Sequence, residues 1–130
     1  MSCLILNLGC ECQTIVISLK NDALVYQLEM QGTYQRAEKV NGKTSWISSS
    51  TGSNTALWYN AVTDDWMIGS VDDLGANIGA ISSTGNQGRS SCPYNVPNDA
   101  WMYAESSSSW IIADANDVSI ECLTGNHSFW

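Results

Sequence analysis

Adjacent carboxylates are the residues in this chain best suited by type to acid–base chemistry. Asp64-Asp65 and Asp72-Asp73 form two such pairs, and glycoside hydrolysis requires a pair of carboxylates. Neighbouring residues on a strand point to opposite faces, however, and Asp is common in turns. Nucleophilic hydrolysis needs a base beside the nucleophile, and the only imidazole, His127, lies close to the C-terminus. We therefore interpret the acidic pairs as turns and expect no catalytic residues.

Calcium is the one metal that the acidic residues suggest. Asp114, Asn116 and Asp117 could supply oxygen ligands together with the two Asp pairs, and calcium takes six to eight oxygens. Their spacing does not match an EF-hand loop, which has Gly at its sixth position and Glu at its twelfth. The prediction is a protein without metal or cofactor, with calcium as the alternative.

Aromatic side chains offer more to a ligand than the carboxylates do. Six Trp and five Tyr stand against one Phe, a bias toward rings with a polar group, which suit contacts with sugars or protein partners. Stacking on a sugar needs an exposed flat ring beside short polar side chains, which the surroundings of Trp58 and Trp101 could supply. The predicted ligand-binding residues are Trp58, Tyr59, Asp64, Asp65 and Tyr103.

Strand alternation limits which of these rings can belong to the core. Because adjacent strand residues face opposite sides, at most one of Trp58 and Tyr59 should be buried. We expect Trp66 and Trp101 to lie inside. Some of three further rings should lie outside: Tyr59, Tyr103 and Trp130.

Cysteine usage points to an oxidising compartment. The chain has five cysteines and no CxxC pair, so it lacks the closely spaced ligand pairs of a zinc site. Cysteines that lie far apart in sequence suit long-loop disulfides, which persist in secreted proteins. We predict that Cys10, Cys12, Cys92 and Cys122 form disulfides. Cys3 is then the odd cysteine, either free or bonded to another chain.

Composition narrows the classes of partner. Charged residues make up 14% of the chain, and 13 acidic against five basic residues give a net charge of −8. An acidic excess without a basic cluster argues against nucleic acid and against an anionic membrane surface. No apolar run approaches the roughly 18–20 residues of a membrane span. The sequon Asn126-His127-Ser128 predicts glycosylation at Asn126 and fits a secreted source.

Short strands must position these side chains. Asn41-Gly42 is a strong two-residue hairpin signal, and Ala56–Ser70 consists of two apolar runs around the turn Asn60–Asp65. Leu24–Met30 alternates like a strand, although a helix competes because Leu, Gln, Glu and Met are good helix formers. Further strands are expected over Gln13–Leu19, from Thr33, over Thr44–Ile47, near Ile78–Ser82, and over Ala100–Ala104, Ser109–Ile112 and Val118–Cys122.

The expected fold is all-β, a single antiparallel β-sandwich or barrel-like domain with long Gly/Ser loops, stabilised by disulfides. Residues 10–123 form this β-rich module. Residues 1–9 are an apolar N-terminal strand or arm, and residues 124–130 are a C-terminal tail. Cys3–Leu8 is apolar but lacks a basic leader and is too short for a signal-peptide core, which favours an edge strand of the fold.

The order of landmarks carries a resemblance to a known kind of module. The landmarks are Gly32-Thr33-Tyr34, Asn41-Gly42, Trp58-Tyr59, Trp66-Met67-Ile68-Gly69, Cys92-Pro93, Trp101, Trp110 and Cys122. Between Cys12 and Cys122 this order resembles a small Cys/Trp-rich β-module that recurs in extracellular multidomain proteins of animals and protists. That module has the pattern G-x-Y, N-G, a Y-Y hairpin answered by W-x-I-G, C-P, W, W and C. The chain departs from it at Trp58, where the pattern has Tyr, and in the additional Cys3 and Cys10.

The resemblance implies a secreted, disulfide-bonded β-module without catalytic residues. It also implies that Cys12 pairs with Cys122, in which case Cys92 needs Cys10 or Cys3. The leading hypothesis for function is therefore a non-catalytic extracellular module for adhesion or recognition, with a glycan as ligand or an extracellular protein as partner. The rival is a structural subunit of a filament or matrix. It would assemble by donating Ser2–Leu8, including Cys3, Leu4, Ile5 and Leu6, to the sheet edge of a neighbour.

Overall fold

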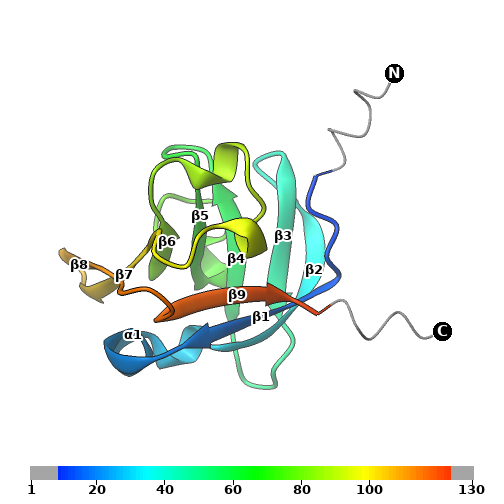
Figure 1. The fold of residues 1–130 in the computed structure, drawn as a ribbon. Helices are drawn as coiled ribbons and strands as arrows, with labels where there is room; N and C mark the ends of the chain where they lie inside the picture. Colours follow the sequence, from blue (N-terminus) through cyan, green and yellow to red (C-terminus); the bar gives the residue numbers. More distant parts are fainter. Residues whose placement is uncertain (1–8, 124–130) are drawn as a thin grey trace.

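The protein folds as one curled antiparallel sheet. We describe it from a computed structural model that covers residues 9–123 of the chain. Its sheet has nine strands in the order β8-β7-β6-β5-β4-β3-β2-β1-β9 and forms a half-barrel (Figure 1). The all-β prediction is confirmed, and the architecture is barrel-like rather than a two-sheet sandwich. The strands are β1 (Thr14–Leu19), β2 (Gly32–Val40), β3 (Lys43–Ser48), β4 (Thr55–Asn60), β5 (Asp65–Ser70), β6 (Ile81–Ser83), β7 (Trp101–Ser106), β8 (Ser109–Ile112) and β9 (Val118–Cys122).

Two hairpins predicted from turn chemistry are present. β2 and β3 pair through Val40 and Lys43 around Asn41 and Gly42, which both have positive φ angles of 55° and 88°. Positive φ at both central residues defines the turn that matches strand twist, and Asn-Gly tolerates it best. β4 and β5 pair without interruption from Thr55↔Ser70 to Asn60↔Asp65.

The strand predicted over Leu24–Met30 is wrong. Helix α1 (Asn21–Gln27) and the 3-10 helix η2 (Leu28–Met30) occupy this segment. Asn21, two residues after the end of β1, has a φ of 55° and turns the chain out of the sheet. The helix then packs on β7, where Gln27 Nε2 donates to the carbonyl of Ala104 at 2.6 Å. The segment is therefore helical, and its packing on β7 settles a choice that the sequence left open between helix and strand.

The two faces of the sheet have different coverings. Paired residues on neighbouring strands share a face, so the register defines a row on each face. On the core face the row contributes to the main hydrophobic cluster, together with residues of β1 and β9, so the sheet curls around this cluster. The core-face row is Trp46, Leu57, Ile68, Ile81, Tyr103 and Ile111, and the outer-face row is Trp58, Met67, Ser82, Met102 and Ile112.

Two disulfides join distant parts of the chain. Cys10 bonds to Cys92 over a sequence separation of 82, and Cys12 bonds to Cys122 over 110. The four predicted disulfide cysteines and the Cys12–Cys122 pairing are thus confirmed. The second bond ties the start of β1 to the end of β9, which run side by side (Figure 1). The predicted assembly residues Cys3, Leu4, Ile5 and Leu6 and the sequon at Asn126 lie outside the described residues.

Three short 3-10 helices complete the described chain: η3 (Val71–Asp73), η4 (Gln87–Arg89) and η5 (Pro93–Asn95). η3 belongs to the loop that follows β5, and η4 and η5 lie on the long connection from β6 to β7. Within residues 9–123 no helix is long and apolar enough to cross a membrane.

Candidate functional site

Most of the predicted ligand-binding residues are buried. The exposed fraction is 0% for Trp58, 9% for Tyr59 and 4% for Tyr103, so none offers a free ring face. Of the three rings of which some were expected outside, Tyr59 and Tyr103 are buried, and Trp130 lies outside the described residues. Trp66 and Trp101 are inside, as predicted.

Trp58 is buried because a loop covers the outer face of the sheet. Trp58 and Tyr59 do point to opposite faces, as alternation requires, but every residue of β4 is buried. The indole Nε1 of Trp58 donates to the carbonyl of Ala76 at 3.0 Å, on the loop between β5 and β6. This loop lies so close that a Cβ at Gly79 would sit 2.3 Å from the sulfur of Met67. The rule that one of two adjacent rings stays exposed fails where both faces of a sheet are covered.

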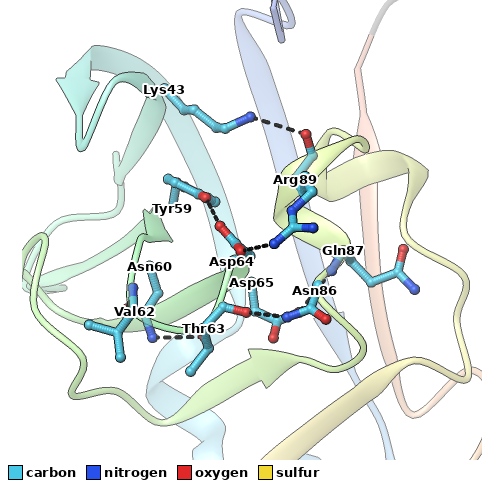
Figure 2. Close-up of polar contacts among 10 residues, drawn as sticks. All are labelled: Lys43, Tyr59, Asn60, Val62, Thr63, Asp64, Asp65, Asn86, Gln87 and Arg89. Atoms are coloured by element: carbon cyan, nitrogen blue, oxygen red, sulfur yellow. Dashed lines mark hydrogen bonds and ion pairs between the residues drawn. The ribbon is translucent and has the colours of Figure 1, made fainter.

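Tyr59 and Asp64 are brought together, but they bind each other (Figure 2). The Tyr59 hydroxyl donates to Asp64 Oδ1, and Arg89 Nη2 donates to Asp64 Oδ2 at 2.5 Å. The hydrogen bond from Tyr59 lowers the pKa of the Asp64 carboxyl, and the hydrogen bond from Arg89 lowers it further. The same bond to Asp64, with burial, raises the pKa of the Tyr59 hydroxyl. The pair stabilises the β4–β5 turn.

Asp65 is the second acidic residue of the turn and is 6% exposed. Its Oδ1 accepts hydrogen bonds from the Ser83 hydroxyl at 2.8 Å and from the Gln87 amide at 2.9 Å. Figure 2 shows how the contact between Gln87 and Asp65, with Asn86 donating to the Thr63 carbonyl, fastens the loop of η4 to the turn. Asp65 also lines a groove on the outer face of the sheet.

That groove is the best candidate site on the outer face. Its volume is about 410 Å³, within the usual range of small-ligand pockets. Trp110 of β8 lies at its rim and is 39% exposed, whereas the other tryptophans of residues 9–123 are at most 1% exposed. Met67, Ile78 and Met102 supply apolar surface. Short polar side chains supply the rest: Asn60, Thr63, Asp65, Asn77, Ser82 and Ser107.

Sequence reasoning missed Trp110, the one aromatic residue within residues 9–123 that lines the groove. It pairs with Ala104, two residues beyond Met102 on β7, and so it shares the outer face with the rest of the groove. β8 pairs only with β7 within the described chain, so no further strand shields the indole. The sequence carried a signal for this position, because Trp110 directly follows the serine run Ser106–Ser109, where short polar side chains adjoin a flat ring.

Asn116 and Asp117, two of the residues considered for calcium, belong to the turn before β9. Asp117 Oδ1 accepts a hydrogen bond from Asn21 Nδ2 at 2.9 Å, and Asn116 Oδ1 accepts one from Asn98 Nδ2 at 2.9 Å. Asn116 has a φ of 76°, a conformation that Asn tolerates in turns. Across residues 9–123 no three His, Cys, Asp or Glu side chains are arranged to hold a metal ion.

Comparison with known proteins gives no guide to this groove. No protein-family model, curated protein or solved structure matches the chain. The function must therefore be argued from the groove itself.

Proposed function

We propose that the protein is a non-catalytic extracellular recognition module that binds carbohydrate in the groove beside Trp110. The observation that carries this proposal is the exposed indole of Trp110 beside hydroxyl, amide and carboxylate side chains. A pyranose has an apolar C–H face and a rim of hydroxyls. It therefore needs a flat ring to stack on and short polar groups to bind its rim, and polar groups of this kind give a pocket its specificity.

The polar side of the groove is preorganised. Asn60 Nδ2 donates to Asn77 Oδ1 at 2.6 Å and to Thr63 Oγ1 at 3.1 Å, which fixes the orientation of both amides. Asn77 Nδ2 and Asp65 Oδ2 make no hydrogen bond within residues 9–123, and no side-chain polar atom there is buried without a partner. These two atoms thus offer a donor and an acceptor to a ligand. Binding to a preformed site avoids the cost of ordering it.

An extracellular location is supported by the two disulfides, because such bonds persist in oxidising compartments. The low content of charged residues and the resemblance to a secreted Cys/Trp module point the same way. A glycan is also a partner that tolerates the net charge of −8, unlike nucleic acid.

Trp110→Ala should weaken glycan binding roughly tenfold, since stacking on one indole face removes several tens of Å² of apolar surface from water, worth about 1.4 kcal/mol. The measurement is a glycan array with the soluble protein, followed by titration of each hit. Ile112→Ala is the matched control, because Ile112 lies two residues away on the same face and is 66% exposed. Trp110→Phe should retain part of the affinity. An array without hits at high protein concentration, or equal weakening by Ile112→Ala, contradicts the proposal.

A second candidate function is self-assembly, and it is favoured by the outer edge of β8, which pairs with no further strand within residues 9–123. β8 consists of Ser109, Trp110, Ile111 and Ile112, so this edge carries no charge. Charged residues normally protect such an edge from pairing with another strand. β9, the other edge strand, packs against η5 and contains Glu121. The donated strand would be Ser2–Leu8.

Deleting Met1–Leu8 should convert assembled particles into monomers if strand donation operates, because the donor strand is then missing. Light scattering on the full chain and on the deletion variant measures this directly. Particles of unchanged size after the deletion exclude strand donation by this segment.

A further inference from the structure

A second cavity lies beyond Tyr59 and Asp64, on the other side of the β4–β5 turn from the groove. Its volume is about 500 Å³, and it is bordered by the β2–β3 hairpin turn and by the segment that follows η4. Three of the chain's five cationic side chains line it: Lys39, Lys43 and Arg89. The remaining lining residues are Gly9, Cys10, Gly42, Thr44, Trp66, Ser90, Ser91 and Cys92. The sequence has no basic cluster, so it is the fold that creates one.

The charge of this cavity is opposite to that of the chain as a whole. No Asp or Glu lines it, although the chain contains 13 acidic residues. Asp64 is the acidic residue that pairs with a cation of this cavity. It lies beside Tyr59 and contacts only Nη2 of Arg89. The Arg89 side chain remains 71% exposed, so its other donors are accessible. Lys39 forms no ion pair within residues 9–123. Arg36, three residues earlier on β2, pairs with Glu11 at 3.0 Å.

Two of the three cations, Lys43 and Arg89, are held in place by their surroundings. Lys43 Nζ donates to the carbonyl of Arg89 at 3.5 Å and lies 4.9 Å from the centre of the Tyr59 ring. Figure 2 shows Lys43 extending from the hairpin toward the Arg89 carbonyl, while the Arg89 side chain extends from η4 toward Asp64. The Cys10–Cys92 disulfide and the hydrogen bond from Trp66 Nε1 to the Ser91 carbonyl, 2.8 Å, fix the opposite wall. Three hydroxyls, on Thr44, Ser90 and Ser91, add further donors.

We propose that this cavity binds the oxyanion group of a small ligand, a sulfate, phosphate or carboxylate. A guanidinium, two ammonium groups and several hydroxyls form a set of donors that suits an anion with several acceptor oxygens. Because the protein as a whole is negatively charged, anions are repelled elsewhere and attracted to this site. The proposal is independent of carbohydrate binding, because the two cavities share no lining residue.

The test is a titration of the full chain with sodium sulfate, sodium phosphate and sodium acetate, followed by ¹⁵N–¹H NMR. Sodium chloride at matched ionic strength controls for screening. We expect saturable shifts of the Trp66 indole N–H and of the Thr44 and Ser90 amides with at least one oxyanion, and the three salts show which oxyanion is preferred. Non-saturating shifts that chloride reproduces would overturn the proposal.

Lys39→Gln should weaken this binding about fivefold, the effect of one unit charge about 4 Å away in a high dielectric. Lys39 is exposed, so the variant should fold. Lys20→Gln changes the net charge equally but lies outside the cavity, and it should leave the affinity unchanged. Equal weakening by both variants would overturn the proposal, since only the overall charge would then matter. Trp110→Ala should not alter anion binding, which separates this site from the carbohydrate groove.

Discussion

Replacing both cysteines of either disulfide by alanine should lower the free energy of unfolding by about 3.5–4 kcal/mol, because the unfolded chain regains loop entropy. The two bonds overlap in sequence, Cys10–Cys92 with Cys12–Cys122. When one bond is removed, the remaining bond still connects the two positions that it joined. The loop that the removed bond closed therefore consists only of residues 10–12 and 92–122, about 32 residues. That loop is the same whichever bond is removed, so the two double variants should be destabilised equally.

Removing all four of these cysteines should cost about 8 kcal/mol, comparable with the whole stability of a domain of this size. Urea unfolding of the wild type, of each double variant and of the quadruple variant measures these values, and mass spectrometry checks the remaining bond. Free energies of unfolding that differ by more than about 1 kcal/mol between the two double variants would contradict a purely entropic origin.

The buried hydroxyl of Tyr34 should make the free energy of unfolding fall at alkaline pH. This side chain is 0% exposed, donates to the carbonyl of Met30 at 2.7 Å and lies 2.8 Å from the Thr55 hydroxyl. Burial raises the pKa of Tyr34 to about 12 from an ordinary value of 10.0. The folded state therefore resists deprotonation, and this contribution to stability is complete below pH 10 and is lost as the pH rises through about 12.

Between pH 10 and 12 the free energy of unfolding should fall by about 2–3 kcal/mol less in Tyr34→Phe than in the wild type, since one pKa unit is worth 1.36 kcal/mol. Below pH 9 the variant should be less stable by about 1 kcal/mol, the value of the lost hydrogen bond. Both proteins are best compared in a Cys3→Ser background, which prevents exchange between that cysteine and the disulfides at high pH. A constant difference between the two proteins from pH 8 to 12 would contradict this account.

Local turn chemistry made much of the fold predictable. Asn41-Gly42 defined one hairpin, and the polar turn after Tyr59 defined the other, because each feature acts within a few residues. The error at Leu24–Met30 arose where a short apolar alternation suits a strand and a helix equally. Contact with β7 settles it, and that contact joins residues far apart in sequence, Gln27 and Ala104.

The binding groove was only partly predictable, for a different reason. Alternation correctly separated Trp58 from Tyr59, but it cannot tell that the β5–β6 loop covers one face. The exposure of Trp110 follows from β8 being the last strand of the sheet, which depends on strand order. Asp65 is the one predicted ligand residue that lines the groove, because it ends the hairpin on the outer face.

The central claim is that a sugar stacks on Trp110, and the indole N–H signals of the tryptophans test it most directly. The protein would be titrated with glucose, galactose, mannose and N-acetylglucosamine, and the Trp110 signal would be assigned by its loss in Trp110→Phe. We predict that at least one sugar shifts the Trp110 indole signal in a saturable way, while those of the buried Trp46, Trp58, Trp66 and Trp101 stay in place. A Trp110 signal that no sugar moves, or a sugar that moves only the buried indoles, would contradict the claim.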